Sequence, residues 1–501
     1  MSNTTENYDV VVIGAGIGGL SAGLHLVDKG YRTLILESHT RPGGLCTSFA
    51  RDGFTFDTCI HWLVGCGEGG YMWYPLKRFG LLPRIKLRHL DRLMTIRTPH
   101  GAVTVDNDLG EFERFLCHLS PHDEKEIMGF FRQVKSLPTM LMPSKEDRIR
   151  HPLRTLGILL SYWPMLPLGW RWGKHTFGSF LQRFREGQKL RPFLAVGGDD
   201  LTVLISFYLY SWVHRQDLYA PQISSLEFSQ AFETRFVEMG GKISYRSRVA
   251  KILVDGGKAT GVRLENGEEI RAKAVVSNAD GYQTLFHLLG EEYVPDSLAQ
   301  FYETSPLFGS MLMVSLGVGA VLSEKDTPAR IVTEWVTTGV LGTGLTDLSR
   351  APLSYKVESL YNPAVAPPGK GVILVEAEAD YREWHDWRQD MGRYKEAKEK
   401  AKEIAVRRAG EYFPQIKGRV EVVDVATPVT FERYTANREG SIQGWRMTPQ
   451  MMRRMNLPMR PTRMPNLFMV GQWVVVGGGI PTSVTGGAKV ADMVEKYLRK
   501  R

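Results

Sequence analysis

A run of glycines near the amino end of this 501-residue chain has the spacing of a phosphate-binding loop. The motif residues are Gly14, Gly16, Ile17, Gly18 and Gly19. In Gly-x-Gly-x-x-Gly, the first glycine allows a tight turn and the second lets a pyrophosphate approach the backbone; the third lets a helix pack on the preceding strand. The apolar run 10–13 predicts that strand, buried on both faces, and residues 20–26 predict the helix. A dinucleotide site is therefore expected here, with the helix amides facing the phosphates.

An acidic residue ends the next predicted strand, residues 33–36. Glu37 stands where a carboxylate accepts hydrogen bonds from a ribose diol, and we include its neighbour Ser38 in the same site. The negative charge disfavours a 2′-phosphorylated nucleotide. It does not distinguish NAD from FAD.

The segment Arg41-Pro42-Gly43-Gly44 and the following residues 53–57 resemble the second glycine doublet of the large FAD-dependent family that includes amine oxidases and carotenoid desaturases. In that family the glycines let the ribityl-phosphate region of the flavin lie against bare backbone. The resemblance implies that FAD is the cofactor and that Arg41, Gly43 and Gly44 contact it. The alternative is a surface turn formed by Pro-Gly-Gly.

A second module in the middle of the chain has the element order found in flavoproteins of this family. It consists of a predicted helix 226–239 and predicted strands 242–245, 249–254, 259–264 and 272–277. In the family, the turn near Val249 reaches the adenine. The resemblance adds Val249 and Asn278, which follows the last strand, to the cofactor site.

The closing segment resembles the carboxyl-terminal flavin-binding signature of the phytoene desaturase and carotenoid isomerase family. A strand over 466–473 ends in glycine, and a glycine-rich loop leads into a helix that runs through 491–497. Such a helix start attracts anionic or carbonyl groups, and in the family it points at the flavin ring. The residues implied are Gly471, Gln472, Gly479, Ile480 and Thr482. The family usually has an acid where Gln472 stands.

Two further stretches resemble retinol saturases. Residues 56–65 look like their Phe-Asp-x-Gly-Ile-His-Tyr-x-x-Gly sequence, although Cys59 replaces a glycine, and residues 427–444 resemble the segment before the closing signature. The chain is thus similar to FAD-dependent phytoene desaturases, carotenoid isomerases and retinol saturases. The resemblance is weak over 76–224 and 290–420, where a substrate would be selected.

The resemblance implies an oxidoreductase that saturates or desaturates a carbon–carbon bond of a long apolar polyene or isoprenoid, by hydride transfer at flavin N5. Saturation also needs a proton donor, for which His61 is the first candidate and Tyr434 the second. His61 has an alternative role as a structural histidine. Two other functions stay open: a redox-neutral cis–trans carotenoid isomerase that uses reduced FAD, and a flavin-carrying lipid-binding protein. Amine oxidation is a more distant possibility.

The expected fold is α/β: a Rossmann-like FAD-binding domain of the glutathione reductase and amine oxidase type, with an inserted mixed α+β substrate domain. The FAD-binding domain is assigned 1–75, 225–290 and 463–501. The substrate domain is assigned 76–224, which is predicted to be mostly helical, and 291–462. A charged helix is predicted over 386–412 within the second substrate segment.

Composition limits the partners and the compartment. Four irregularly spaced cysteines and no metal-binding spacing favour reduced thiols, a cytoplasmic location and no metal, and the first residues lack a secretory pattern. A net charge of +9 comes with no nucleic-acid motif.

Residues 151–175 and 451–463 mix basic with aromatic or apolar side chains, as at a membrane interface. We therefore expect an apolar small-molecule substrate, no nucleic acid and peripheral contact with the inner face of a membrane, against the alternative that these are ordinary substrate-domain helices. The oligomeric state stays open.

Overall fold

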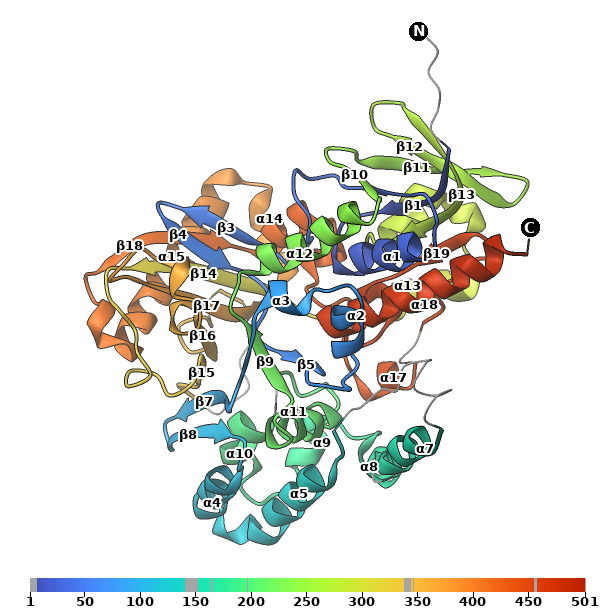
Figure 1. Cartoon of the computed structure of the whole chain (residues 1–501). Helices are drawn as coiled ribbons and strands as arrows, with labels where there is room; N and C mark the ends of the chain where they lie inside the picture. Colours follow the sequence, from blue (N-terminus) through green and yellow to red (C-terminus); the bar gives the residue numbers. More distant parts are fainter. Residues whose placement is uncertain are drawn as a thin grey trace.

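The computed structural model describes residues 7–139, 152–163, 165–195, 197–337, 344–345, 347–454 and 457–500. The first residues, which bear on the secretory pattern, and parts of the predicted membrane segments 151–175 and 451–463 lie outside these ranges. The described chain forms three regions: a sheet next to both termini, a second sheet, and a lobe of helices below them (Figure 1).

The first sheet has seven strands in the order β10-β2-β1-β13-β12-β11, with β19 also paired to β13. The strands are β1 (Tyr8–Ile13), β2 (Thr33–Leu36), β10 (Lys242–Ser244), β11 (Val249–Asp255), β12 (Lys258–Leu264), β13 (Glu269–Ser277) and β19 (Leu467–Met469). The pairs β10–β2, β2–β1, β1–β13 and β13–β19 are parallel, and β11–β12–β13 is an antiparallel meander. All carboxyl ends of the parallel strands therefore meet at one edge.

Two helices pack unusually closely on one face of this sheet. They are α1 (Ile17–Asp28) and α18 (Ile480–Leu498). A Cβ on Gly487 of α18 would lie 2.6 Å from the backbone nitrogen of Ala22 in α1. The glycine therefore sets the distance between the two helices, and α12 (Ser225–Glu238) also packs against α1.

The second sheet has the order β18-β14-β17-β16-β15-β7-β8. The strands are β7 (Arg92–Thr98), β8 (Gly101–Asp106), β14 (Ser310–Val318), β15 (Ile331–Glu334), β16 (Leu353–Val357), β17 (Gly371–Ala379) and β18 (Val420–Ala426). Helices α14 (Tyr381–Arg388) and α15 (Met391–Tyr412) cover it, and α16 (Pro428–Thr435) follows β18. The hairpin of β3 (Ser48–Arg51) and β4 (Phe54–Asp57) packs Phe54 and Phe56 on this sheet.

The single helix predicted over 386–412 is wrong at its beginning. Asp390 has an extended backbone, and its carboxylate accepts hydrogen bonds from the amides of Gly392 and Arg393 at 2.8 and 3.3 Å. An aspartate in this arrangement caps a new helix. The chain therefore ends α14 and starts α15 here.

The helical lobe has an aromatic core. Its helices are α4 (Gly110–Leu119), α5 (Glu124–Ser136), α7 (Pro152–Ser161), α8 (Met165–Trp172), α9 (Phe177–Leu181), α10 (Gly187–Leu194) and α11 (Leu204–His214). Phe130 contacts Phe131, Phe180 and Phe207, with ring centroids 4.7–6.0 Å apart. Smaller elements join the lobe to the first sheet: α2 (Trp73–Arg78), α3 (Leu82–Ile85), β5 (Leu63–Val64), β6 (Leu87–His89) and β9 (Leu218–Pro221). Toward the other end of the chain lie α13 (Asp296–Thr304) and α17 (Pro449–Met452).

Candidate active site

One cavity of about 1800 Å³ reaches from the glycine loop after β1 to helix α8 of the lobe. A pocket for a single drug-sized ligand is roughly 300–1,000 Å³. The cavity therefore has room for a large cofactor and a second ligand. Its walls come from both sheets and from the helical lobe.

The glycine end of the cavity is a backbone cradle around Asn278. A Cβ on Gly16 would lie 2.6 Å from Nδ2 of Asn278, and a Cβ on Gly471 would lie 2.5 Å from its Oδ1. A Cβ on Gly18 would also meet that oxygen. Two segments that are distant in sequence, at residues 16–18 and at Gly471, therefore approach the amide side chain of Asn278, and side chains at these glycines would fill the space.

Two helices begin at this cradle without a side-chain cap among the described residues. Helix α1 follows Gly16 and helix α18 follows Gly479, and neither of these two glycines provides a side-chain cap. Both helices also lack an acidic residue in the first turn. Free N–H groups and the positive end of the helix dipole suit anionic or carbonyl oxygens.

Glu37 is buried after the end of β2, and its carboxylate accepts hydrogen bonds from the glycine loop and from the residues that follow β2. Its Oε2 accepts a hydrogen bond from the amide of Ala15 at 2.8 Å, and its Oε1 accepts from the amide of His39 at 2.8 Å and from the hydroxyl of Ser38 at 3.2 Å. A carboxylate offers about four acceptor sites. Glu37 therefore retains capacity for a ribose hydroxyl while it orients the glycine loop.

All of the predicted site residues except Gly19 and Arg41 line the cavity. Gly19 packs instead beneath the turn, where a Cβ would collide with the carbonyl oxygen of Gly14. The Arg41 guanidinium donates to the carbonyl of Ser48 at 3.1 Å. Tyr434 lies beside His39, with ring centroids 5.6 Å apart, at the end of the cavity that holds Glu37.

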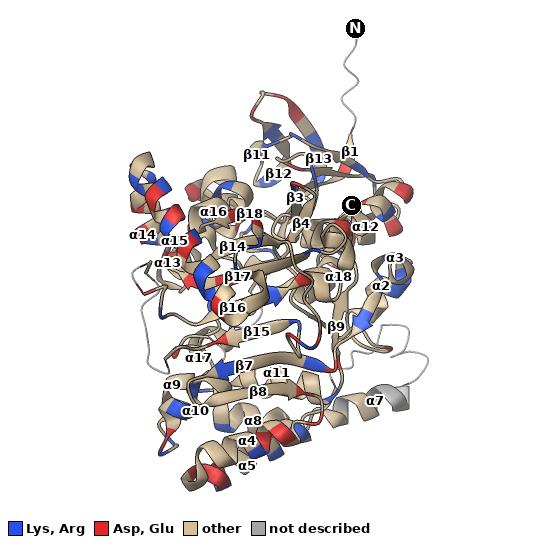
Figure 2. Cartoon of the chain, turned by 90° about the vertical axis from the view of Figure 1, so that its left-hand side faces the viewer, with Lys and Arg blue, Asp and Glu red and all other residues tan. Residues whose placement is uncertain are grey.

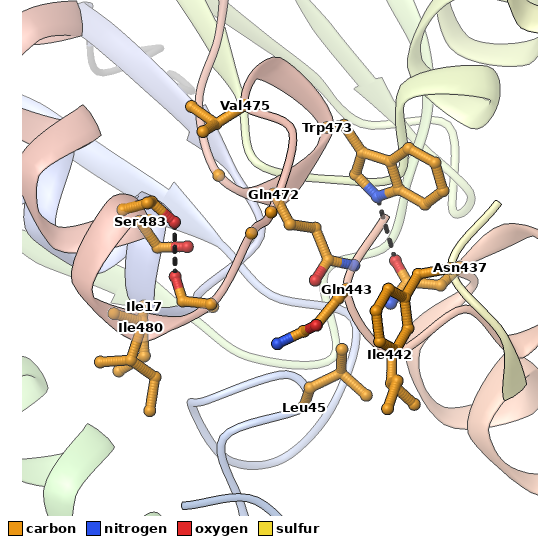
Figure 3. Close-up of a pocket in the computed structure, with 18 of the residues that line it drawn as sticks. Ile17, Leu45, Asn437, Ile442, Gln443, Gln472, Trp473, Val475, Ile480 and Ser483 are labelled. Atoms are coloured by element: carbon orange, nitrogen blue, oxygen red, sulfur yellow. Dashed lines mark hydrogen bonds between the residues drawn. The ribbon is translucent and has the colours of Figure 1, made fainter. Parts of the chain in front are cut away.

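Figure 3 shows Gln443, Trp473 and Asn437, which the sequence analysis did not name as site residues. Gln443 and the predicted Gln472 point toward the same space, between Ile17 and Ile480 on one side and Trp473 on the other. The indole of Trp473 donates to Oδ1 of Asn437 at 3.3 Å. Gln443 and Asn437 fall within the stretch 427–444. The resemblance of this stretch to retinol saturases was the feature of the sequence that could have identified them as site residues.

His61 is half-buried on the cavity wall, and both of its ring nitrogens have protein partners. Nδ1 lies 3.0 Å from the carbonyl oxygen of Cys59, and Nε2 lies 2.7 Å from Oε2 of Glu376. Glu376 is on β17 and also lines the cavity. Burial alone would raise the pKa of Glu376, but the neighbouring His61, Lys356 and Arg330 lower it. Sequence reasoning found His61 and missed its partner.

The far half of the cavity is mainly apolar and aromatic. Helix α11 contributes Tyr208 and Trp212, whose rings stack with centroids 6.4 Å apart, and β14 contributes Met311 and Met313. The cavity reaches the surface at Trp170 of α8, which is almost fully exposed. This half can enclose an elongated apolar molecule.

The parallel sheet, the glycine cradle and the two uncapped helix starts define a protein of the dinucleotide-binding class. The chain matches the model of the flavin containing amine oxidoreductases over residues 17–494 and belongs to that family. It is therefore an FAD-dependent oxidoreductase.

Relatives and solved structures agree with this membership. The chain is 26% identical to prolycopene isomerase 1 of an Oncidium hybrid cultivar, covering 98% of this chain and 84% of the relative. It is 25% identical to all-trans-retinol 13,14-reductase of Rattus norvegicus, covering 95% and 84%. The crystal structure of an oxidoreductase from Methanosarcina mazei has the same fold, with a TM-score of 0.62 and 17% identity over 97% of this chain and all of that chain.

Proposed function

We propose that this protein transfers hydride between FAD and a carbon–carbon bond of a long apolar polyene or isoprenoid, saturating or desaturating it. The observation that carries the proposal is the continuity of one cavity from the glycine cradle to an apolar, aromatic half. Relatives named for retinol reduction and prolycopene isomerisation support the choice of substrate class.

The cofactor would be held by the predicted residues that line the cradle. The amides at the starts of α1 and α18 would hold anionic and carbonyl oxygens of the cofactor, and Glu37 would accept a hydrogen bond from a ribose hydroxyl. Bound FAD supplies two-electron hydride chemistry at its N5 atom. The protein positions the substrate, excludes water from the apolar half and, through His61, provides the proton that a saturation needs.

The test is anaerobic incubation of flavin-loaded protein with a panel of polyenes, in both oxidation states of the flavin. Gain or loss of two hydrogens in the product mass is expected. A product of unchanged mass with altered chromatographic retention would instead support the second candidate, a redox-neutral cis–trans isomerase, which the prolycopene isomerase relatives favour. Binding without any product would leave a flavin-carrying lipid-binding protein.

We also propose that helices α7 and α8 rest on the inner, cytoplasmic face of an anionic membrane. Six of the thirteen exposed large apolar side chains of the described chain lie between residues 153 and 170. Trp163 and Leu160 are 69% and 61% exposed. In Figure 2 blue and red mark α4, α5, α14 and α15, whereas the described part of α7 is tan.

Position and charge make a membrane the favoured occupant of this surface. The exposed surface of α7 and α8 surrounds the cavity opening at Trp170, so an apolar substrate would pass from lipid into the cavity without crossing water. Arg171 and Lys174 follow immediately, as basic side chains do at headgroup level. None of the helices in the described part of the chain combines the length and hydropathy that a bilayer crossing requires.

Flotation with anionic liposomes at low salt tests this surface. The double variant Leu160→Ser/Trp163→Ser should lose most of the floated fraction, while flavin content stays unchanged because neither residue lines the cavity. The matched control Val237→Ser/Val321→Ser removes two exposed apolar side chains elsewhere. Equal flotation of both variants would contradict the assignment.

The division into an FAD-binding domain (1–75, 225–290, 463–501) and a substrate domain (76–224, 291–462) is likewise our proposal. The strand pairing supports it, because β1, β13 and β19 come from the three FAD-binding segments and join one sheet.

A further inference from the structure

Five ionisable side chains form a buried cluster behind His61. Each has less than 5% of its surface exposed: Asp57, Arg330, Lys356, Glu358 and Glu376. Lys356 Nζ lies 2.7 Å from Glu358 Oε1 and 3.7 Å from Asp57 Oδ1, and Arg330 donates to Glu358 Oε2 at 2.6 Å. Three carboxylates and two cations leave this cluster with one unbalanced negative charge.

The unbalanced charge falls on Glu376. Its Oε2 is 2.7 Å from Nε2 of His61, and its Oε1 is buried without a hydrogen-bond partner among the described residues. Arg330 is committed to Glu358 and to the backbone carbonyls of Ile60 and His61, 3.2 and 3.0 Å away. A buried charge without compensation is costly. His61 is the group in direct contact that can supply the sixth charge.

The hydrogen-bond geometry requires two protons on the His61–Glu376 pair, which with an ionised Glu376 places both on the ring. Nδ1 of His61 faces a carbonyl oxygen, which only accepts, so Nδ1 must carry a proton. Nε2 faces a carboxylate at 2.7 Å, so a proton must also lie between these two atoms. A neutral ring opposite an ionised Glu376 would place a lone pair against a negative charge.

We propose that Glu376 is a positioning residue that keeps His61 doubly protonated, so that the pair stores the proton consumed when a double bond is reduced. The use of this proton in catalysis rests on the proposed function. The protonation state of the pair does not depend on that function. The lowered pKa of Glu376 agrees with an ionised carboxylate. Nearby Glu378, also on β17, is paired instead with Arg446 at 3.4 Å, and Arg446 with Asp200.

The reduction balances with this proton. One carbon of the double bond receives a hydride from the reduced flavin, and the other receives the proton of the pair as the carbon–carbon π bond is lost. His61 is left neutral with its proton on Nδ1, Glu376 remains ionised, and the flavin is left oxidised. A proton from water and a two-electron donor to the flavin restore the starting state. A redox-neutral isomerisation would not consume the stored proton.

Nitrogen NMR of histidine-labelled, flavin-loaded protein tests the inference without any substrate. In the unaltered protein at pH 7 we expect both ring nitrogens of His61 to carry a proton, as its two hydrogen bonds require. In Glu376→Gln the amide can still donate to Nε2, but the charge is gone, so His61 should be neutral with a bare Nε2 at pH 7. The matched control Glu378→Gln should leave the His61 signals unchanged.

Assignment uses His61→Gln, and Glu376→Asp keeps the charge and should restore the doubly protonated ring. Unchanged flavin absorbance and circular dichroism would show that Glu376→Gln is folded. A bare Nε2 in the unaltered protein at pH 7, or a doubly protonated ring in Glu376→Gln, would overturn the inference.

With a polyene that the protein reduces, Glu376→Gln should slow reduction roughly 10²-fold, the lower range for loss of general acid catalysis, with little change in KM. If no polyene is reduced, the proposed function fails, while the NMR result still decides the protonation of the pair.

Discussion

Gly16 gives a direct test of the cofactor site that we propose. A Cβ there would lie 2.6 Å from the Asn278 side chain, and a larger branch would enter the cavity where we propose that the diphosphate binds. We expect Gly16→Val to abolish the visible flavin absorbance of the purified protein. Gly129→Val is the control, because a Cβ on Gly129 of α5 meets nothing within 4 Å and valine is tolerated in helices. A yellow Gly16→Val protein would contradict the assignment of the site.

Asp217 should make stability depend on pH. It is buried, Oδ1 accepts from the amide of Gly65 at 3.1 Å, and Oδ2 has no partner among the described residues. Burial raises the pKa of this carboxyl to about 6. The folded protein then binds a proton more tightly than the unfolded chain between pH 4 and pH 6, so the free energy of unfolding falls as pH rises through this window.

Asp217→Asn removes this ionisation while it keeps the acceptor for Gly65. We expect the substitution to increase the free energy of unfolding by about 1–3 kcal/mol at pH 7, and the difference should shrink toward zero near pH 4. Urea denaturation at both pH values measures it. An equal effect at both values would show that ionisation is not responsible.

Residues within a local motif were predictable, and residues paired across the molecule were not. Glu37 could be found because it ends a strand at a fixed distance from the glycine loop. Glu376 lies 315 positions from His61, and only the pairing of distant strands brings the two together. The only local indication of Glu376 is that it is a charged residue in the apolar run of β17. Glu378 in the same strand has the same property, so the pattern does not single out Glu376.

At the scale of elements, the cap at Asp390 can be tested. Asp390→Ala removes the acceptor for two amides at the start of α15, and we expect the free energy of unfolding to fall by about 1 kcal/mol. Asp386→Ala, a change at an exposed site in α14, is the control and should have little effect. Chemical denaturation of both variants gives the comparison; similar losses would argue against a capping role.

Elements of the parallel sheet were predicted closely because burial on both faces leaves a continuous apolar run, as in β1 and β13. The segment 76–224 was interpreted as mostly helical, and the hairpin of β7 and β8 within it was not identified. β7 is placed by parallel pairing with β15, more than two hundred residues later. No local pattern encodes such a partner.

For the whole molecule, we expect bound FAD to stabilise the folded state. Its cradle joins the ends of β1, β2, β13 and β19, and a ligand that binds only the folded state stabilises it in proportion to the logarithm of its concentration. Free FAD at about 100 times its Kd should add about 2.7 kcal/mol. Thermal unfolding of the apoprotein against FAD concentration measures this; a midpoint that does not move would contradict it.

The late return of the chain to its first sheet has a consequence for synthesis on the ribosome. β19 and α18 complete the nucleotide cradle, yet they are made long after β1 and α1. In the nascent polypeptide, one side of the earliest strands and helix therefore stays uncovered until β19 and α18 have been made. Because the start of α18 lines the cavity, we expect stable flavin loading only after residues 467–498 have left the ribosome.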